Sequence, residues 1–256
     1  MRNIKIEIEY DGTDFYGWQF QPELRTIQGD IENALKVIFR NEITVIGAGR
    51  TDTGVHARGQ VANFLIEDTM PVLTVKAALN GNLSKDVRII SSEEVSQSFH
   101  ARYDAIKRHY SYTITKQEKA IDRHYMWCYK SALDVEQMQH ASQRLLGEHD
   151  FSAFCQADEN MKHYRCFMEE IRWEQNGALL ILNIIANRFL HNMVRIIVGT
   201  MINVGRGFAK VEDIPQILES RDRRNAGPTI PAKGLCLEKV YYGDGDGTGG
   251  GNEIFY

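Results

Sequence analysis

Hydrophobic and polar residues alternate in two stretches of the chain, residues 3–10 and residues 107–115. In the first, NIKIEIEY, every second residue is isoleucine or tyrosine, and the residues between them are polar or charged. A period of two is typical of a strand that has one buried face. Residues 26–40 instead carry apolar side chains at helical spacing. The pattern therefore indicates a mixed α+β protein.

The first half of the chain predicts the order strand, helix, strand, strand, helix, strand. A proline precedes the second helix, and its fixed φ suits the start of a helix. The expected elements are a strand at 3–10, a helix at 26–40, a short strand at 43–46, a strand at 61–66, a helix at 72–79 after Pro71, and a strand at 87–90.

The second half repeats this order and adds one helix. Asp134 and Gln137 resemble a capping box at a helix start, and Asn176-Gly177 is a strong hairpin signal. The expected elements are a strand at 107–115, a helix at 134–146 stopped by Gly147, two strands flanking Asn176-Gly177, a mostly apolar helix at 189–204, a short helix at 214–219, and a strand at 235–242.

The repeated order β-α-β-β-α-β is that of the ferredoxin-like unit. We therefore predict an α+β fold of two such units in tandem, an N-terminal half at residues 1–104 and a C-terminal half at residues 105–242. The remaining residues, 243–256, are rich in glycine, and we expect this tail to be disordered.

Composition and charge exclude several classes of protein. The chain of 256 residues has a formal net charge of −4, whereas polyanion binders are more often basic. This argues only weakly against nucleic acid, because a local basic cleft can lie on an acidic protein. The four cysteines form no C-x-x-C pair, so we expect neither a disulfide framework nor a zinc site. The absence of a secretory signal pattern and of a long apolar run predicts a cytoplasmic protein with no membrane segment.

Residues 47–59, GAGRTDTGVHARG, form the predicted connection between the second and third strands. Loops on a rigid sheet often carry functional residues. Asp52 lies between Arg50 and Arg58 in the sequence, and a nearby guanidinium would keep its carboxylate ionised. Such a carboxylate could act as a nucleophile or base toward an anionic substrate. The alternative is an ordinary turn aspartate in a connector whose glycines allow positive φ.

Residues 99–110, FHARYDAIKRHY, interleave aromatic and basic side chains. On RNA-binding surfaces, aromatic faces stack on exposed bases while basic groups hold phosphates. The alternative is a strand edge with solvated charges. Tyr110 lies on the apolar side of its strand, so by itself it is more typical of a core tyrosine than of a substrate contact.

Arg195 lies in FLHNMVRIIVG, within an otherwise nearly apolar predicted helix. A guanidinium in that setting is costly unless it is paired, so we expect it to meet a buried carboxylate. It shares a helix face with His191, four residues earlier. The alternative is an arginine that snorkels to solvent at the helix end. The histidines show no metal-binding spacing.

Five segments together resemble the bacterial tRNA pseudouridine synthase A family. They are GAGRTDTGVHA at 47–57, FHARY at 99–103, KRHYSYTI at 107–114, FLHNMVRIIVG at 189–199 and PAKGLCL at 231–237. They occur in the family's order and span nearly the whole chain up to about residue 242. The first of these motifs is highly specific.

The resemblance implies a role for individual residues. Asp52 matches the catalytic aspartate, Tyr110 the tyrosine that stacks on the target uracil, and Arg195 the arginine that binds the aspartate. Arg50 would pair with Asp52 and help hold the place of the flipped-out nucleotide, and Leu235 would pack against the base. The segment expected to contact RNA comprises Phe99, His100, Ala101, Arg102 and Tyr103, with Arg58, Lys107 and Arg108 as further basic contacts.

The resemblance also implies an activity and an assembly. The family isomerises uridine to pseudouridine at positions 38, 39 and 40 of the tRNA anticodon stem-loop, as a homodimer, without a cofactor or a metal. Its fold is pseudo-symmetric, with two ferredoxin-like halves, a central antiparallel sheet and a cleft.

The chain departs from the family pattern in one loop, from Cys155 to Phe167. After Cys155-Gln156 the family usually has a small polar residue and soon a proline, whereas this chain has acidic Asp158 and Glu159 and no proline. The departure bears on the tRNA contacts there and on which uridines are modified.

Two other functions compete with this expectation. A base glycosylase commonly needs a second acid or an activated water, as the carboxylate pair of glycosidases illustrates, and the strongest motif has a single carboxylate. A non-catalytic RNA-binding protein could use two RRM-like units, but the chain has no RNP-type aromatic run.

Overall fold

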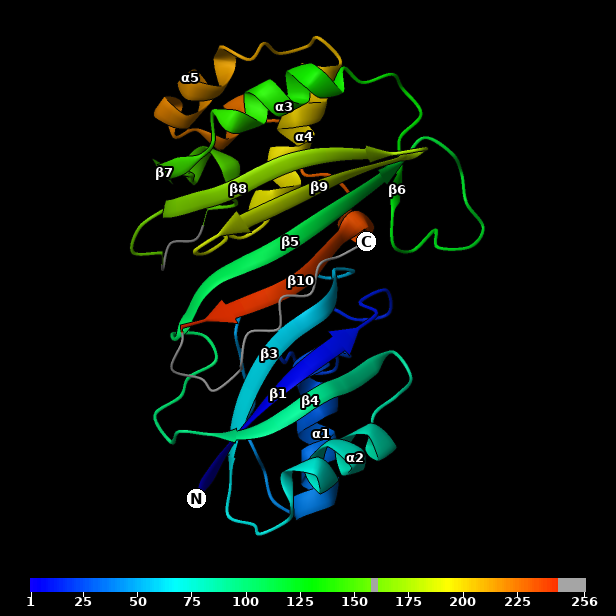
Figure 1. Ribbon diagram of the computed structural model, residues 1–256, viewed down its shortest axis with the longest axis vertical. Helices are drawn as coiled ribbons and strands as arrows, with labels where there is room; N and C mark the ends of the chain where they lie inside the picture. The colour runs from blue at the N-terminus through cyan, green and yellow to red at the C-terminus, as the bar shows by residue number, and fades with distance from the viewer. Residues whose placement is uncertain (158–160, 244–256) are drawn as a thin grey trace.

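The computed structural model describes residues 1–157 and 161–243. Within these residues, ten strands form one sheet with the order β4-β1-β3-β10-β5-β9-β8-β7, while β2 pairs with β3 and β6 with β5. Figure 1 shows the strands of the two halves toward opposite ends of this sheet, with β3 and β10 in the middle. Asp158, Glu159 and the tail residues 244–256 lie outside the described residues.

The N-terminal half follows the predicted order. Its elements are β1 (Arg2–Tyr10), α1 (Ile27–Phe39), β2 (Ile46–Gly47), β3 (His56–Ile66), α2 (Val72–Asn82) and β4 (Val87–Val95). The alternating isoleucines of β1 are fully buried, as its period of two predicts. Thr26 caps α1, because its side chain accepts a hydrogen bond from Gly29 N. The expected strand at 43–46 is wrong in extent, since only two residues pair with β3.

The C-terminal half keeps the predicted elements and adds short strands. Its elements are β5 (Ala105–Thr115), β6 (Trp127–Cys128), α3 (Val135–Gln143), β7 (Gly147–Asp150), β8 (Arg165–Asn176), β9 (Leu179–Ala186), α4 (Met193–Gly205), α5 (Asp213–Ser220) and β10 (Leu235–Tyr242), with 3₁₀ turns at Ser152–Phe154, Arg223–Asn225 and Ala232–Gly234.

Two predicted helix boundaries in this half are wrong. α3 ends at Gln143, so Leu145 lies beyond it, although Leu145 is still fully buried. α4 begins at Met193 rather than at Phe189, because Asn192 adopts a left-handed φ of 62° that a helix cannot include. Residues 189–192 therefore form a loop ahead of the helix.

The two halves meet through β3 and β10, which run parallel. Cys236 pairs with His56, and Leu237 with Ala57. The strands come very close at Gly59, where a Cβ would lie 2.5 Å from the carbonyl oxygen of Glu238. The expectation of an antiparallel central sheet is therefore wrong at the junction, and the sheet is mixed. The reason is that β10 takes its direction from its antiparallel pairing with β5 of its own half.

Register across this junction places one row of side chains on a single face of the sheet. Tyr10 pairs with Ala57, Ala57 with Leu237, and Leu237 with Tyr110. Directly paired residues point to the same face. The row thus crosses β1, β3, β10 and β5 at the centre of the molecule, and these four side chains belong to one buried cluster. In the described part of the chain, no helix is long and apolar enough to cross a membrane.

Candidate active site

The loop that carries Asp52 connects β2 to β3 and is fastened to a second loop, residues 11–18. Trp18 N donates to the carbonyl of Thr51 (3.0 Å), and Gly54 N donates to the carbonyl of Phe15 (3.4 Å). Gly12 is packed so tightly that a Cβ there would lie 2.0 Å from the carbonyl oxygen of Val55. The Asp52 loop is therefore held in a fixed conformation by the turn that follows β1.

Of Gly47, Gly49 and Gly54 in the Asp52 loop, only Gly54 adopts a positive φ that favours glycine. Gly54 has a left-handed φ of 75°, while Gly47 and Gly49 do not adopt positive φ. Gly47 instead makes room for the Trp18 ring, which a Cβ would approach to 2.5 Å. The tight backbone approach to the Asp52 loop involves Gly12, which lies outside the motif and was not predicted to belong to the site.

Arg195 of α4 meets Asp52 across the cleft. Its Nη1 lies 3.4 Å from Asp52 Oδ2. The same guanidinium donates from Nε to the carbonyl of Ile230 (2.7 Å) and from Nη1 to Asn192 Oδ1 (2.7 Å). The carboxylate that Arg195 was expected to meet is thus Asp52, although the pair is only partly buried. The Arg195 side chain is 18% exposed and that of Asp52 is 27% exposed, so the carboxylate is open to a ligand.

His191 is a second group beside the carboxylate that the sequence analysis did not assign to the site. Its Nε2 lies 3.6 Å from Asp52 Oδ1, and its side chain is half exposed. The sequence feature that could have identified His191 as a site residue is its spacing of four residues from Arg195. In the structure, however, His191 lies in the loop before α4, so the loop rather than the helix brings it to Asp52.

The two arginines that flank Asp52 in the sequence do not pair with it. Arg50 is exposed and forms no ion pair with any described residue. Arg58 lies on β3, where its Nη1 binds Glu238 Oε1 at 2.7 Å. Side chains alternate along a strand, and Arg58 points to the face opposite the cleft. The expected Arg50–Asp52 pair is therefore wrong, and the positive charge beside the carboxylate comes from Arg195.

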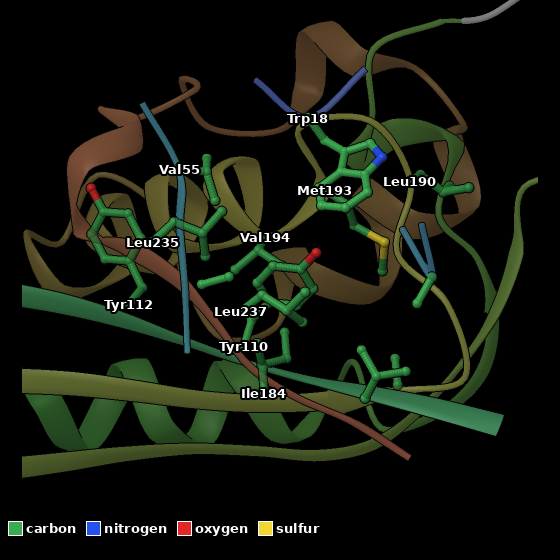
Figure 2. Packing of buried hydrophobic residues seen from close by; sticks show 14 of the residues in the cluster. Trp18, Val55, Tyr110, Tyr112, Ile184, Leu190, Met193, Val194, Leu235 and Leu237 are labelled. Carbon is green, nitrogen blue, oxygen red and sulfur yellow. The ribbon is translucent and has the colours of Figure 1, made fainter. Parts of the chain in front are cut away.

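Tyr110, Leu235 and Leu237 form an apolar floor next to the carboxylate. Tyr110 is 8% exposed and its ring meets Phe189 edge-on, with centroids 5.1 Å apart. Figure 2 shows Tyr110 near Leu237 and α4 residue Val194, with its hydroxyl directed away from that of Tyr112. Burial, together with the negative charge of Asp52, raises the pKa of Tyr110. The phenol is therefore neutral at physiological pH.

These groups line a cleft of about 1040 Å³ at the junction of the halves. Among the described residues that line it, Asp52 is the single carboxylate, whereas five arginines contribute positive charge: Arg50, Arg102, Arg108, Arg188 and Arg195. The described lining of the cleft is therefore strongly basic, although the whole chain carries a net charge of −4. Aromatic side chains line it too, namely Tyr16, Trp18, Tyr103, Tyr110 and Phe189.

The segment expected to contact RNA divides into buried and exposed residues. Phe99 and Ala101 are buried at 6% and 0% exposure, so an RNA contact through their side chains is not supported by their position. Phe99 packs against Tyr242 instead. Tyr103 is 77% exposed, and its ring lies 4.2 Å from that of His100. Arg102 is exposed as well, and both Arg102 and Tyr103 line the cleft.

Two basic residues of β5 that were expected to contact RNA, Lys107 and Arg108, have partners within the protein. Lys107 binds Glu169 Oε1 at 2.8 Å and its ammonium lies over the Tyr241 ring, away from the residues that line the cleft. Arg108 lines the cleft but donates its hydrogen bonds to backbone carbonyls. The direct RNA contact expected of Lys107 is therefore not supported by its position.

The loop that departs from the family pattern touches the site through its first residues. Gln156 Oε1 accepts from Asn192 Nδ2 (3.0 Å), and Gln156 N donates to the carbonyl of His191 (3.1 Å). Met161 lines the cleft. Over residues 1–157 and 161–243, there is no cluster of three or more histidine, cysteine or acidic side chains that could hold a metal.

Comparison with known proteins shows the family of the chain. The family model described as tRNA pseudouridine synthase matches residues 6–104 and 141–243. The tRNA pseudouridine synthase A 2 of Clostridium perfringens is 46% identical, over 94% of this chain and 100% of that protein. The tRNA pseudouridine synthase A of Moorella thermoacetica is 44% identical, over 93% of this chain and 99% of that protein.

A solved structure gives a more distant match. A chain of the crystal structure of a Cbf5-Nop10-Gar1 complex aligns with 12% identity and a TM-score of 0.34, over 78% of this chain and 54% of that chain. This likeness is too low to carry an argument. On the family model and the full-length relatives, the chain belongs to the tRNA pseudouridine synthase A family of isomerases.

Proposed function

We propose that this protein isomerises uridine to pseudouridine in the anticodon stem-loop of tRNA, at positions 38 to 40, with Asp52 as the catalytic residue. The observation that carries the proposal is the charge of the cleft, because among the described residues that line it one carboxylate lies among five arginines. The arginines suit a polyanion, and the single carboxylate, held beside Arg195, suits chemistry on one nucleotide of it.

The reaction requires no net oxidation and no second substrate. The N1–C1′ bond of uridine breaks, the uracil turns, and a C5–C1′ bond forms. The proton on C5 leaves and N1 gains one, so atoms and electrons balance within the nucleotide. Asp52 starts the cleavage of the N1–C1′ bond. Its partial exposure in the cleft supports this role, because the carboxylate can reach a nucleotide from its fixed loop.

The uracil must leave the helical stack before it can meet Asp52. Flipping a base costs a few kcal/mol, which contacts elsewhere on the RNA can offset. Tyr110 stacks on the uracil, and Leu235 packs against it, a role that is supported by their place in the lining of the cleft. The neutral phenol of Tyr110 can accept or donate a hydrogen bond at the base, but it does not carry a negative charge next to Asp52.

The exposed residues at the rim hold the RNA on either side of the flipped nucleotide. Arg50 fills the place that the nucleotide leaves in the stem, and Arg102 binds the phosphate backbone. His100 and Tyr103 stack on each other at the rim and offer an aromatic surface to an unpaired base. Arg50, Arg102 and Tyr103 are exposed and His100 is partly exposed, which supports the assignment.

We further propose that each half, residues 1–104 and 105–242, is a ferredoxin-like unit. The strand orders β4-β1-β3-β2 and β10-β5-β9-β8 support this, because both follow the chain order 4-1-3-2. We also propose a cytoplasmic homodimer, on the strength of the family resemblance. Sedimentation of the purified protein across a concentration series tests the dimer.

Nucleoside analysis of an unmodified tRNA transcript after incubation with the protein tests the activity. The proposal predicts pseudouridine in the anticodon stem-loop and no free uracil. Released uracil with an abasic site would indicate a glycosylase instead. A protein that shifts tRNA in a gel and leaves every uridine unchanged would be a non-catalytic binder.

A further inference from the structure

We propose that Arg108 is a positioning residue, which ties the Asp52 loop to the loop that carries His191 and so sets the geometry across the cleft. The proposal rests on the function proposed above, since it concerns the same reaction. Arg108 does not touch the reacting nucleotide in this account. It acts through the backbone of the residues that do.

The guanidinium of Arg108 donates four hydrogen bonds to four backbone carbonyls. Nη1 binds the carbonyls of Ala105 (2.9 Å) and Asn187 (2.8 Å). Nη2 binds those of Ala48 (3.0 Å) and Arg102 (3.0 Å). These carbonyls belong to three segments that are far apart in the sequence. One side chain therefore joins the start of the Asp52 loop, the connection between the halves and the end of β9.

One end of this connection leads to Asp52 itself, and the other leads to His191, which lies beside its carboxylate. Ala48 begins the loop that carries Asp52, and its own N–H donates to the carbonyl of Val61 on β3 (2.8 Å). Asn187 begins the loop that carries His191, and it exchanges two hydrogen bonds with Phe167 of β8. Each loop is thus hydrogen-bonded to a strand of the sheet at its first residue. Arg108 binds the carbonyl of that same residue in both loops and so links them across the cleft.

The hydrogen bonds leave Arg108 poorly suited to bind a phosphate. A guanidinium has five N–H donors, and four of them are already engaged with carbonyls. Arg50 and Arg102 differ, because in the described part of the chain their guanidinium groups donate no hydrogen bond. Arg108 is half-buried and has no described carboxylate partner. The expectation that it contacts RNA directly is replaced by a role inside the protein.

Only an arginine can make this connection. Its planar fork presents donors in two directions at once, whereas lysine is a single point charge with three donors at one atom. A lysine at position 108 could reach one or two of the carbonyls and would leave others unpaired. The consequence for catalysis is a shift of Asp52 relative to His191 and Arg195, and a displacement of about 1 Å can reduce a rate by about 100-fold.

The test compares R108K and R108A with the wild-type protein and with a control, R88M. Arg88 is also a strand arginine that donates to backbone carbonyls, but those of Ser84 and Val87 in its own segment, away from the cleft. The measurements are the single-turnover rate of pseudouridine formation at saturating tRNA, the Kd for tRNA as a function of salt, and the thermal unfolding midpoint.

We expect both Arg108 variants to lower the rate at saturating tRNA by about 10- to 100-fold, with the Kd and its salt dependence within twofold of wild type. Added guanidinium ion should partly restore R108A. R88M should retain the wild-type rate. If R108A does not fold, R108K decides the question, because it keeps the charge and most of the volume.

Two results would overturn the proposal. If the rate is unchanged and the tRNA Kd rises with a salt dependence weaker by about one ion, Arg108 binds a phosphate. If folded R108K has the wild-type rate and Kd, the four hydrogen bonds do not position the site. A wild-type protein that makes no pseudouridine would instead contradict the proposed function, which separates the two failures.

Discussion

Arg195 and Asp52 lie 143 positions apart in the sequence, yet Arg195 Nη1 is 3.4 Å from Asp52 Oδ2. The arginine is held on its other sides by the carbonyl of Ile230 and by Asn192 Oδ1. The helix of one half therefore fixes the orientation of a carboxylate that the other half supplies, and the cleft between the halves is where both are available.

Replacement of Arg195 tests whether its guanidinium group orients the Asp52 carboxylate. In R195K the charge is kept but the three simultaneous contacts are lost. We expect the rate at saturating tRNA to fall by about 10- to 100-fold while the Kd for tRNA stays within twofold. Single-turnover kinetics and a filter-binding titration measure the two quantities. A wild-type rate in R195K would show that charge alone suffices.

The arginines on either side of Asp52 should behave differently from each other. Arg50 is exposed at the cleft, whereas Arg58 binds Glu238 on the opposite face. R50Q should weaken tRNA binding and reduce the salt dependence of log Kd by about one. R58Q is the matched control and should leave both unchanged. Equal effects of the two substitutions would contradict the separation of the two faces.

We expect substitution of Gly12 to reduce stability and activity, unlike substitution of a helical glycine, because Gly12 packs against the backbone of Val55. In G12A the Cβ would collide with the carbonyl of Val55, so the Asp52 loop must move. We expect a lower unfolding midpoint and a reduced rate at saturating tRNA. G81A, in an open position of α2, is the control and should be stabilising by about 0.5–1 kcal/mol. Wild-type activity in G12A would show that the loop tolerates the shift.

The raised pKa of Tyr110 predicts a loss of stability at alkaline pH. Because the folded protein holds this proton more tightly than the unfolded chain, the contribution is fully present below about pH 10 and is lost as the pH rises above that value. Between pH 10 and 11, the free energy of unfolding of the wild type should fall faster than that of Y110F, by up to about 1.4 kcal/mol per pH unit.

Urea unfolding of wild type and Y110F at a series of pH values measures this difference. Y103F removes an exposed hydroxyl and is the control, which should follow the wild type. Parallel curves for wild type and Y110F would mean that Tyr110 is not buried as described.

Local patterns sufficed to predict most elements of the fold. The alternation of β1 and β5, the Asn176-Gly177 hairpin and the cap of α3 all depend on neighbours within a few residues. The parallel pairing of β3 with β10 did not follow from them, because it depends on contacts between residues 180 positions apart, such as Arg58 with Glu238. The left-handed Asn192 was missed since an apolar helical pattern continues across it.

Local sequence patterns also sufficed to predict part of the site. Asp52 stands out as an acidic residue in a glycine-rich motif, and Arg195 as a charge in an apolar helix. Adjacency in sequence then misled, since Arg50 and Arg58 flank Asp52 but neither meets it. The tight contact of Gly12 with Val55 and the carbonyl partners of Arg108 could not be predicted, because they depend on segments that are far apart in the sequence.

Replacement of the Asp52 carboxylate by an amide tests whether Asp52 is the catalytic residue. An unmodified tRNA transcript is incubated with the wild-type protein or with D52N, and pseudouridine is mapped by carbodiimide treatment and primer extension. We expect stops in the anticodon stem-loop with the wild type and none with D52N, while both proteins bind the tRNA with similar Kd. Pseudouridine formed by D52N above a protein-free control would contradict the assignment of Asp52.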